Sequence, residues 1–468
     1  MTLPRERPWL PTTAPPDLVF TDVSLVSPEA GKTFAGASIR ISNGVVVEVS
    51  TDPSKPVAAS ANSETVNLRG KYICPGLIDC HVHMTATPGS FVFKSMFDIH
   101  PSTHAYRTAF VVKEMLLRGY TTARDCGGAD AALRDAIAEG LLPGPRLFIA
   151  GKALSQTGGH GDGRSPHDRQ DVTVACCGGH QPALARVVDG VPACLHAARD
   201  ELRQGANFLK VMCGGGLASL SDPLDMIQFT AEEVQAITTT AANMHTYVTA
   251  HAYTPEAIRH AVDNGVMGIE HGNFIDKDTA RLCATKGVII TPTLITYQAG
   301  LRPPFDHFYT DDQKRKARQI LNVGLDSLKI CKEAGVMMCY GTDLLGGTNF
   351  WQSEEFSVRS AVLSPVEILR SATTNAAKLL RHEGKLGVLQ AGAFADLLIL
   401  SDDPLENISV LDQVDQTLLA IVKDGRVVSS SLEEVSIDPL YRYYLREQPD
   451  HGRAKERESR TDQDWVVV

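Results

Sequence analysis

The sequence predicts an α/β protein: a (β/α)8 TIM barrel with a small composite β-sandwich domain built from both ends of the chain. Between residues 71 and 385, short apolar strands alternate with amphipathic helical segments, which is typical of a parallel sheet with helical crossovers. Eight such units within about 300 residues favour a barrel over an open sheet. The flanking regions 17–70 and 386–430 instead consist of short strands and turns.

These patterns of predicted secondary structure divide the chain into three parts. Residues 1–70 are expected to form an N-terminal extension and the first part of the β-sandwich, and residues 71–385 the catalytic barrel. Residues 386–468 are expected to form the second part of the β-sandwich and a C-terminal tail. Asn43-Gly44 and Asp424-Gly425 are hairpin turn signals within the two flanking regions.

The barrel strands are expected where short apolar runs precede polar residues. Their ranges are 73–83, 121–125, 146–150, 208–212, 246–251, 268–271, 288–293 and 336–342. Several of the intervening helical segments are followed by glycine, for example Gly287 and Gly335, where a left-handed helix cap is common. No Gly-x-Gly-x-x-Gly follows a strand, which weakens a dinucleotide-binding interpretation.

Composition excludes several classes of partner and location. The 468 residues carry a formal net charge of −10 and no Lys/Arg-rich block, so neither nucleic acid nor a membrane surface is an expected partner. The N-terminus lacks the apolar core of a signal peptide, and no apolar run approaches the ~20 residues of a membrane span. The ten cysteines form no Cys-x-x-Cys pair, so free thiols in a reducing compartment are expected. A cytoplasmic location follows as an expectation, with secretion by another route left open.

His81-Val82-His83 ends the first apolar run and is the most informative feature of the chain. In a strand, residues i and i+2 point to the same face, so the two imidazoles leave the strand side by side. The alternative to a metal site is two surface histidines whose ring nitrogens already have hydrogen-bond partners. Further candidate ligands downstream favour the metal.

These further candidates occupy the ends of other predicted strands, where the active sites of such barrels lie. Lys210 is in the fourth strand, His251 ends the fifth, His271 ends the sixth, and Asp343 follows the eighth. Lys210 has apolar neighbours, and a buried ammonium needs a partner or a chemical modification. Each histidine alone could be a satisfied core residue, and Asp343 a helix cap. Together with His81 and His83 these residues make six candidate ligands at the same end of the predicted barrel, and this concentration indicates metal binding.

The ordered set resembles the amidohydrolase superfamily. The resemblance covers about residues 17–430 and rests on PGLIDCHVH, Lys210, AHAY with His251, EHG with His271, and GTD with Asp343. It implies the binuclear type, in which Lys210 is carboxylated to N6-carboxylysine and bridges two divalent metal ions. Imidazole and carboxylate ligands suit Zn²⁺ best, and Co²⁺ or Mn²⁺ are the alternatives.

The resemblance also implies the role of each ligand and the reaction. His81, His83 and Asp343 would bind the first metal, and His251 and His271 the second. Two metals lower the pKa of a shared water, so a bridging hydroxide would attack the substrate carbonyl. Asp343 would carry the proton to the leaving nitrogen. No Gly-x-Ser-x-Gly elbow is present, so no serine nucleophile is expected.

The glycine-rich loop at residues 155–170 is the expected substrate-binding loop. It resembles the matching loop of prolidase-like and imidazolonepropionase-like members, and the overall pattern looks closest to ochratoxinase-type amidohydrolases. The resemblance implies that His160 and Tyr253 contact the substrate. Arg164 or Arg169 could anchor a substrate carboxylate. A mobile surface loop is the alternative.

We therefore predict a metal-dependent hydrolase that cleaves the amide bond of small N-acyl amino acids or dipeptides. Its chemistry would be carboxypeptidase-like, and ochratoxin A-type substrates are within its expected range. A cyclic amidohydrolase or imidazolonepropionase-like hydrolase is the alternative enzyme, and a non-catalytic assembly protein on the same barrel is the alternative class. The resemblance further suggests a homo-oligomer that acts on a small-molecule substrate.

Overall fold

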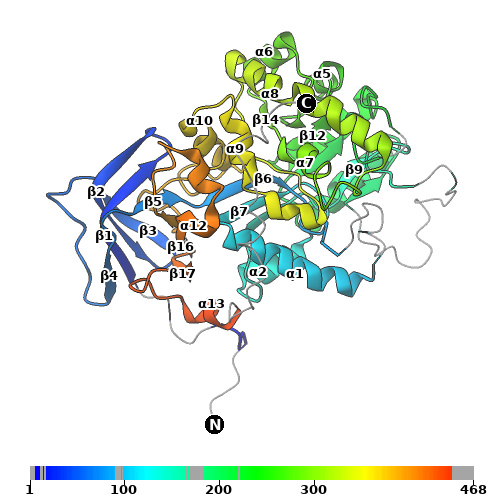
Figure 1. The fold of residues 1–468 in the computed structure, drawn as a ribbon. Helices are drawn as coiled ribbons and strands as arrows, with labels where there is room; N and C mark the ends of the chain where they lie inside the picture. The colour runs from blue at the N-terminus through cyan, green and yellow to red at the C-terminus, as the bar shows by residue number, and fades with distance from the viewer. Residues whose placement is uncertain are drawn as a thin grey trace.

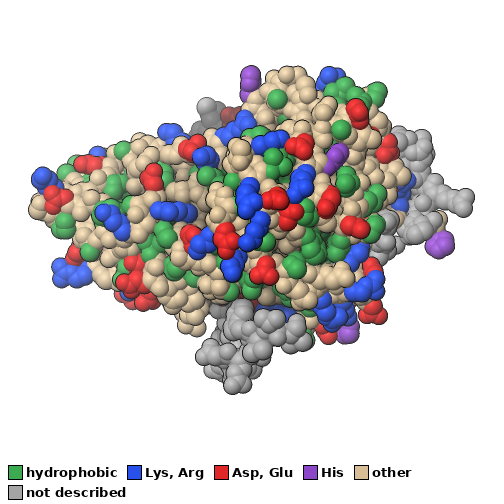
Figure 2. Space-filling model, turned by 90° about the horizontal axis from the view of Figure 1, so that it is seen from above, with side chains coloured by type: hydrophobic (Ala, Val, Ile, Leu, Met, Phe, Trp, Pro, Cys, Tyr) green, Lys and Arg blue, Asp and Glu red, His purple; other side chains and the backbone are tan. Residues whose placement is uncertain are grey.

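The computed structural model describes residues 6–10, 14, 17–89, 96, 99–164, 167, 184–219 and 222–444. Strands from the two ends of the chain lie together on one side of the molecule, and an α/β region with helices around parallel strands occupies the other side (Figure 1). Among the described residues, no helix has the length and apolar character needed to span a membrane. Figure 2 shows a face on which basic and acidic side chains are interspersed.

One eight-stranded sheet joins the two ends of the chain, in the order β17-β16-β15-β5-β1-β2-β3 with β4 paired to β1. Its apolar side chains, such as Phe20, Ile39 and Leu397, form a core of their own. Its strands are β1 (Asp17–Ser27), β2 (Lys32–Ser42), β3 (Val45–Ser50), β4 (Ser63–Asn67), β5 (Tyr72–Pro75), β15 (Leu397–Leu400), β16 (Leu418–Lys423) and β17 (Arg426–Ser430).

The α/β region contains two parallel sheets. One has the order β6-β7-β8 and the other the order β10-β9-β11-β12-β13-β14. Their strands are β6 (Leu77–Val82), β7 (Tyr120–Asp125), β8 (Arg146–Ile149), β9 (Ala153–Ser155), β10 (Ala185–Val187), β11 (Leu209–Met212), β12 (Val248–Ala252), β13 (Gly268–His271) and β14 (Ile289–Thr291).

Backbone contacts link these two sheets at two places. The Asn207 N–H, just before β11, donates to the Ile149 carbonyl at the end of β8 over 2.7 Å. At the β14 edge, Met338 bridges to Ile290 of β14, and the Cys80 N–H of β6 donates to the Tyr340 carbonyl over 2.8 Å. The segment around residues 338–340 therefore lies between β14 and β6.

The predicted first strand, residues 73–83, is two strands. β5 pairs with β1 and β15 in the eight-stranded sheet, whereas β6 pairs with β7 in a parallel sheet. Gly76 separates them, and a Cβ at this position would lie 2.1 Å from Thr121 Oγ1. The backbone therefore passes directly against β7 as it leaves one sheet for the other.

The predicted eighth strand, residues 336–342, is not a strand but an extended segment with one isolated bridge at Met338. Its backbone groups bond elsewhere: the Tyr340 N–H donates to the Ser371 carbonyl over 2.9 Å, and the Asp343 N–H to the His81 carbonyl over 2.8 Å. A regular ladder is therefore not formed, but the segment still lies beside β6, where the Cys80 N–H donates to the Tyr340 carbonyl. The three-residue strands β9 and β10 were not predicted, because so short a run has no periodic pattern.

Helices follow most of the parallel strands, and several of them begin at a side-chain cap, for example from Asp130, Thr230, Thr254, Asp276 or Thr310. Gly287 and Gly335 end α6 and α8 with left-handed φ values of 67° and 74°, as the sequence predicts. The longer helices are α1 (Pro101–Leu117), α2 (Ala131–Ala138), α3 (Val191–Arg203), α4 (Ala231–Asn243), α5 (Pro255–Asp263), α6 (Lys277–Lys286) and α8 (Asp311–Ala334). The shorter ones are α7 (Ile295–Ala299), η2 (Gly346–Trp351), α9 (Glu354–Ser360), α10 (Pro365–Ser371), α11 (Thr374–Leu379), η3 (Ile408–Leu411), α12 (Val414–Thr417) and α13 (Pro439–Tyr444).

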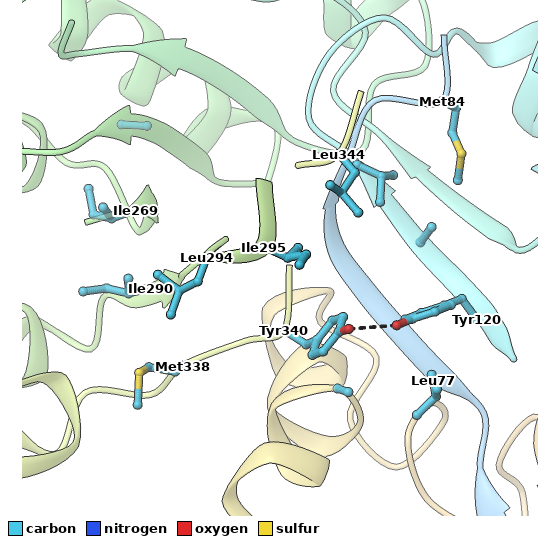
Figure 3. Close-up of a cluster of buried hydrophobic side chains, with 14 of the residues drawn as sticks. Leu77, Met84, Tyr120, Ile269, Ile290, Leu294, Ile295, Met338, Tyr340 and Leu344 are labelled. Carbon is cyan, nitrogen blue, oxygen red and sulfur yellow. Dashed lines mark hydrogen bonds between the residues drawn. The ribbon is translucent and has the colours of Figure 1, made fainter. Parts of the chain in front are cut away.

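The largest apolar cluster packs between the parallel strands and the helices around them. Figure 3 shows Leu77 of β6, Tyr120 of β7 and Ile290 of β14 in this cluster, together with Met338 and Tyr340. The Tyr120 and Tyr340 hydroxyls are 2.8 Å apart, so the buried phenols satisfy each other. This packing holds the 338–343 segment against β6 and thereby places its polar end beside the end of that strand.

Candidate active site

His81, His83 and Asp343 come together at the end of β6. The Asp343 Oδ1 atom lies 3.4 Å from His81 Nε2 and 3.3 Å from His83 Nε2. These three side chains form a group whose ligand atoms are close enough to share one metal ion. The backbone bond from the Asp343 N–H to the His81 carbonyl fixes the carboxylate beside the two rings. The predicted convergence of these three residues is therefore present.

The other ring nitrogens of both histidines are held by hydrogen bonds. His83 Nδ1 lies 2.8 Å from the Gly127 carbonyl oxygen, which can only accept, so this nitrogen carries the proton. His81 Nδ1 lies 2.8 Å from Glu270 Oε2. Each ring therefore keeps its Nε2 free toward Asp343, which is the arrangement that metal-binding histidines usually have.

His251 in β12 and His271 at the end of β13 lie next to this group. Their ring centroids are 4.7 Å apart, and the His271 and His81 centroids are 4.9 Å apart. His251 Nε2 is 3.1 Å from the Gly215 carbonyl oxygen and so donates to it, which leaves Nδ1 available for a ligand. All four predicted histidine ligands thus belong to one cluster.

Lys210 in β11 is 2% exposed and lies in register with Thr249 of β12. Among the described residues it forms no salt bridge. Burial and, after it, the positive charge of Lys210 lower the pKa of His81 to about 4. Burial likewise holds the pKa values of His251 and His271 well below their ordinary range, with Lys210 again contributing. These imidazoles are therefore neutral near pH 7, as metal ligation requires.

Asp343 is ionised in this setting. Burial alone would raise its pKa, but His81, His83 and Lys210 lower the pKa of this carboxyl to about 2. Asp343 and His271 also have left-handed backbones, with φ values of 51° and 76°. Such conformations are costly for residues other than glycine and cluster at functional sites. Two of the predicted ligands are thus held in unfavourable backbone conformations by their surroundings.

Sequence reasoning missed the carboxylate behind His81. Glu270 is fully buried, and besides His81 it contacts Arg124 Nη2 at 2.5 Å and accepts a hydrogen bond from the Thr249 hydroxyl. Burial would raise the pKa of Glu270, but Arg124, His81 and Lys210 hold it well below its usual range. The only signal for it in the sequence is its position directly before His271 in Glu-His-Gly.

The three predicted substrate contacts differ in their placement. The His160 ring stacks on the His251 ring at 4.2 Å with an interplanar angle of 17°. Tyr253 is 2% exposed, and its ring centroid lies 4.8 Å from that of His251. Arg164 instead forms a paired salt bridge with Asp162, at 2.8 Å from Nε and 2.6 Å from Nη2. Arg169 lies outside the described residues.

Tyr297 of α7 is a further residue of this cluster that was not predicted. Its hydroxyl donates to the Tyr253 hydroxyl over 3.1 Å and lies 3.3 Å from both His271 Nδ1 and Asn273 Oδ1. His271 Nδ1 also lies 2.7 Å from Thr293 Oγ1. Tyr297 therefore connects the predicted substrate contact Tyr253 with the predicted ligand His271.

Several known proteins are similar to this chain over most of its length. A prolidase in complex with N-methylphosphonate-L-proline is similar, with 39% identity, a TM-score of 0.84, and coverage of 89% of this chain and all of that chain. A Xaa-Pro dipeptidase with bound methionine is 28% identical, with a TM-score of 0.75 and coverage of 88% and 99%. Ochratoxinase from Aspergillus niger is 28% identical over 410 residues, which is 86% of this chain and 85% of that protein.

The amidohydrolase family model matches residues 72–428, which include all six predicted ligands and both parallel sheets. The resemblance found in the sequence is therefore confirmed, together with its ochratoxinase-like and dipeptidase-like relatives. Hydrolysis of amide bonds is the activity that these relatives support. The chain belongs to the amidohydrolase family.

Proposed function

We propose that this enzyme hydrolyses the amide bond of small N-acyl amino acids or dipeptides with two divalent metal ions, most suitably Zn²⁺. The observation that carries the proposal is the convergence of four imidazoles, one ionised carboxylate and one buried lysine. His81, His83 and Asp343 would hold the first ion. His251 and His271, whose rings lie beside that group, would hold the second.

The donor set fits this pair of ions. Imidazole nitrogen and carboxylate oxygen are ligands that Zn²⁺ accepts readily. Lys210 as an ammonium would repel both ions, whereas a carbamate on its Nζ would supply an anionic oxygen to each. The burial of Lys210 without a salt bridge among the described residues supports this modification to N6-carboxylysine.

In the reaction, Asp343 is the proton carrier. When bound, two such ions would lower the pKa of a water molecule and polarise the scissile carbonyl. Asp343 is ionised, so its carboxylate can accept a proton from the attacking water. It then returns the proton to the leaving nitrogen as the C–N bond breaks. The backbone hydrogen bond from the Asp343 N–H to the His81 carbonyl keeps the carboxylate beside His81 and His83 for both transfers.

The substrate class rests on the relatives and on the residues around the histidine cluster. The similar proteins include a prolidase, a Xaa-Pro dipeptidase and an ochratoxinase, which supports an amide joined to a terminal amino acid. His160 and Tyr253, both against the His251 ring, are the proposed substrate contacts. Arg164 would have to exchange Asp162 for the carboxylate of the substrate.

We also propose that the two parallel sheets and the 336–342 segment form the predicted (β/α)8 barrel. The backbone contacts that link the sheets near β8 and β11, and through residues 338–340 between β14 and β6, support this closure. The barrel would correspond to residues 71–385. Residues 1–70 and 386–468 would supply the accessory domain, in which β1–β4 and β15–β17 share one sheet.

A small substrate panel tests the proposed function. It contains N-acetylphenylalanine, another N-acyl amino acid, a Xaa-Pro dipeptide and a dihydropyrimidine, each assayed with and without prior chelation of metal. We expect turnover of the open-chain amides, its loss after chelation, and its return when Zn²⁺ and bicarbonate are added. Turnover of the dihydropyrimidine alone, or activity that survives complete removal of metal, would contradict the proposal.

A further inference from the structure

We propose that Asp222 and Ser219 are positioning residues that fix the His160 ring with its Nδ1 protonated and its Nε2 offered to the substrate. This inference rests on the proposed function, because that function makes His160 a substrate contact. The inference identifies the residues that determine which nitrogen of the His160 ring faces the substrate.

The direction of each hydrogen bond in this group follows from the chemistry of its members. The Ser219 hydroxyl donates to Asp222 Oδ1, and His160 Nδ1 lies 2.8 Å from the same hydroxyl oxygen. A hydroxyl has one proton, and an ionised carboxylate can only accept. Ser219 Oγ must therefore accept from His160, so Nδ1 carries a hydrogen. Asp222 Oδ2, at 3.6 Å from Nδ1, adds electrostatic support for that hydrogen.

Asp222 is itself held in place and kept ionised. Its side chain is fully buried, and its Oδ2 atom accepts hydrogen bonds from the Gly216 N–H over 2.9 Å and Gln228 Nε2 over 3.1 Å. Burial would raise the pKa of Asp222, but its bonds to His160 and Ser219 hold the pKa below the ordinary value. The other end of Gln228, Oε1, accepts from the His160 N–H over 2.9 Å. One glutamine thus holds both the carboxylate and the backbone of the histidine.

The His160 ring is also confined by its packing. One contact is the parallel stacking against His251. Another is with Gly216, where an added Cβ would lie 1.9 Å from His160 Cε1. Glycine is therefore needed at residue 216 for the ring to lie against the backbone. A flip of the ring would replace Nδ1 by a carbon next to Ser219 Oγ and lose the hydrogen bond. None of the described residues forms a hydrogen bond with Nε2.

The decisive experiment is a double-mutant cycle between His160→Ala and Asp222→Asn, assayed with the best substrate of the panel above. Asp225→Asn is the matched control, because Asp225 is an exposed aspartate in the same loop. We expect Asp222→Asn to raise KM about 10- to 100-fold, as for a lost hydrogen bond to a charged group, while kcat and bound metal stay nearly unchanged. In the His160→Ala background it should raise KM no further.

The cycle separates failure of this inference from failure of the proposed function. If His160→Ala leaves KM unchanged, His160 is not a substrate contact and that part of the proposed function is wrong. If His160→Ala raises KM but Asp222→Asn does not, or if the two effects simply add, the positioning role is wrong.

A measurement without substrate gives a second, independent test. The ring ¹⁵N shifts of His160, assigned by their loss in His160→Ala, should report a protonated Nδ1 in the unaltered enzyme. Asp222→Asn should change that pattern and Asp225→Asn should not. An Nδ1 without a proton in the unaltered enzyme would overturn the proposal even if no substrate of the panel is turned over.

Discussion

Glu270 Oε2 lies 2.8 Å from His81 Nδ1, so a fully buried carboxylate fixes the ring orientation of a predicted metal ligand. Glu270 directly precedes His271, and neighbouring residues in a strand normally point to opposite faces. Here both contact the His81 ring, because the left-handed backbone of His271 ends the regular strand. On its other side, Glu270 meets the buried guanidinium of Arg124 at 2.5 Å.

Glu270→Gln should weaken metal binding and the fold together. Loss of the carboxylate behind a ligating histidine typically lowers metal affinity about 10- to 100-fold. It also leaves the Arg124 charge buried without its partner, which costs about 3–5 kcal/mol of the free energy of unfolding. Metal content after dialysis against a chelator and urea unfolding measure the two effects. Glu256→Gln, at an exposed glutamate on α5, is the control. Full metal retention in the Glu270 variant would refute the role in orienting His81.

Lys210→Ala should abolish activity and lower the metal content. Under the proposed function, the substitution removes the oxygen donors that would bridge both ions, and no other described side chain replaces them. Metal analysis of the purified variant and an assay of amide hydrolysis check this result. Lys277→Ala, at a lysine whose side chain is 68% exposed, should change neither quantity. A Lys210 variant with full activity would be incompatible with a bridging role.

Asp343→Asn should cut turnover by about 10²- to 10⁴-fold, because the variant cannot accept and return a proton. The amide has nearly the shape of the carboxylate, so circular dichroism and the thermal midpoint should change little. Asp278→Asn, at an aspartate whose side chain is 78% exposed, controls for the change of charge. Turnover within a few-fold of the unaltered enzyme would mean that another group carries the proton.

Asp276→Ala should destabilise the fold by about 1 kcal/mol through the loss of a helix cap. Asp276 Oδ1 accepts from the Thr279 N–H over 2.7 Å at the start of α6. Its bonds to Thr279 and the nearby Arg259 lower its pKa in the folded protein. This stabilisation is therefore present above the ordinary aspartate pKa of about 4 and is lost as the pH falls through the lower folded value.

The pH dependence of unfolding provides the measurement for this cap. The difference in unfolding free energy between Asp276→Ala and the unaltered protein should be largest near neutral pH and shrink in acid. Asp278→Ala, in the first turn of the same helix, lacks the capping hydrogen bond and serves as the comparison. An equal loss in both variants would show that the cap contributes nothing specific.

Much of the site could be predicted because its residues sit at the ends of recognisable strands. The range 268–271 predicted for the sixth strand is that of β13, and His271 is its last residue. His81, His251 and Lys210 likewise lie in the strands in which the sequence places them. The local periodicity of the sequence and the parallel direction of the strands were sufficient to predict in which strand each of these residues lies.

The partners of these residues could not be predicted, because they are far apart in the chain. Glu270 is 189 residues from His81, and Ser219 is 59 residues from His160. Glutamate and serine are also common in surface positions, so neither residue type signals a buried role. Arg164 shows the opposite case: its residue type suits a carboxylate anchor, but in the fold it pairs with Asp162.

The sequence by itself determined the family, the alternation of strands and helices, and the six candidate metal ligands. These depend on residue identity and short spacing, which the chain carries locally. Only the tertiary structure decided that Glu270 and Arg124 stand behind His81, that Asp222 and Ser219 hold His160, and that residues 336–342 form no regular strand. Those features arise from contacts between distant segments, where burial removes water and makes each hydrogen-bond partner matter.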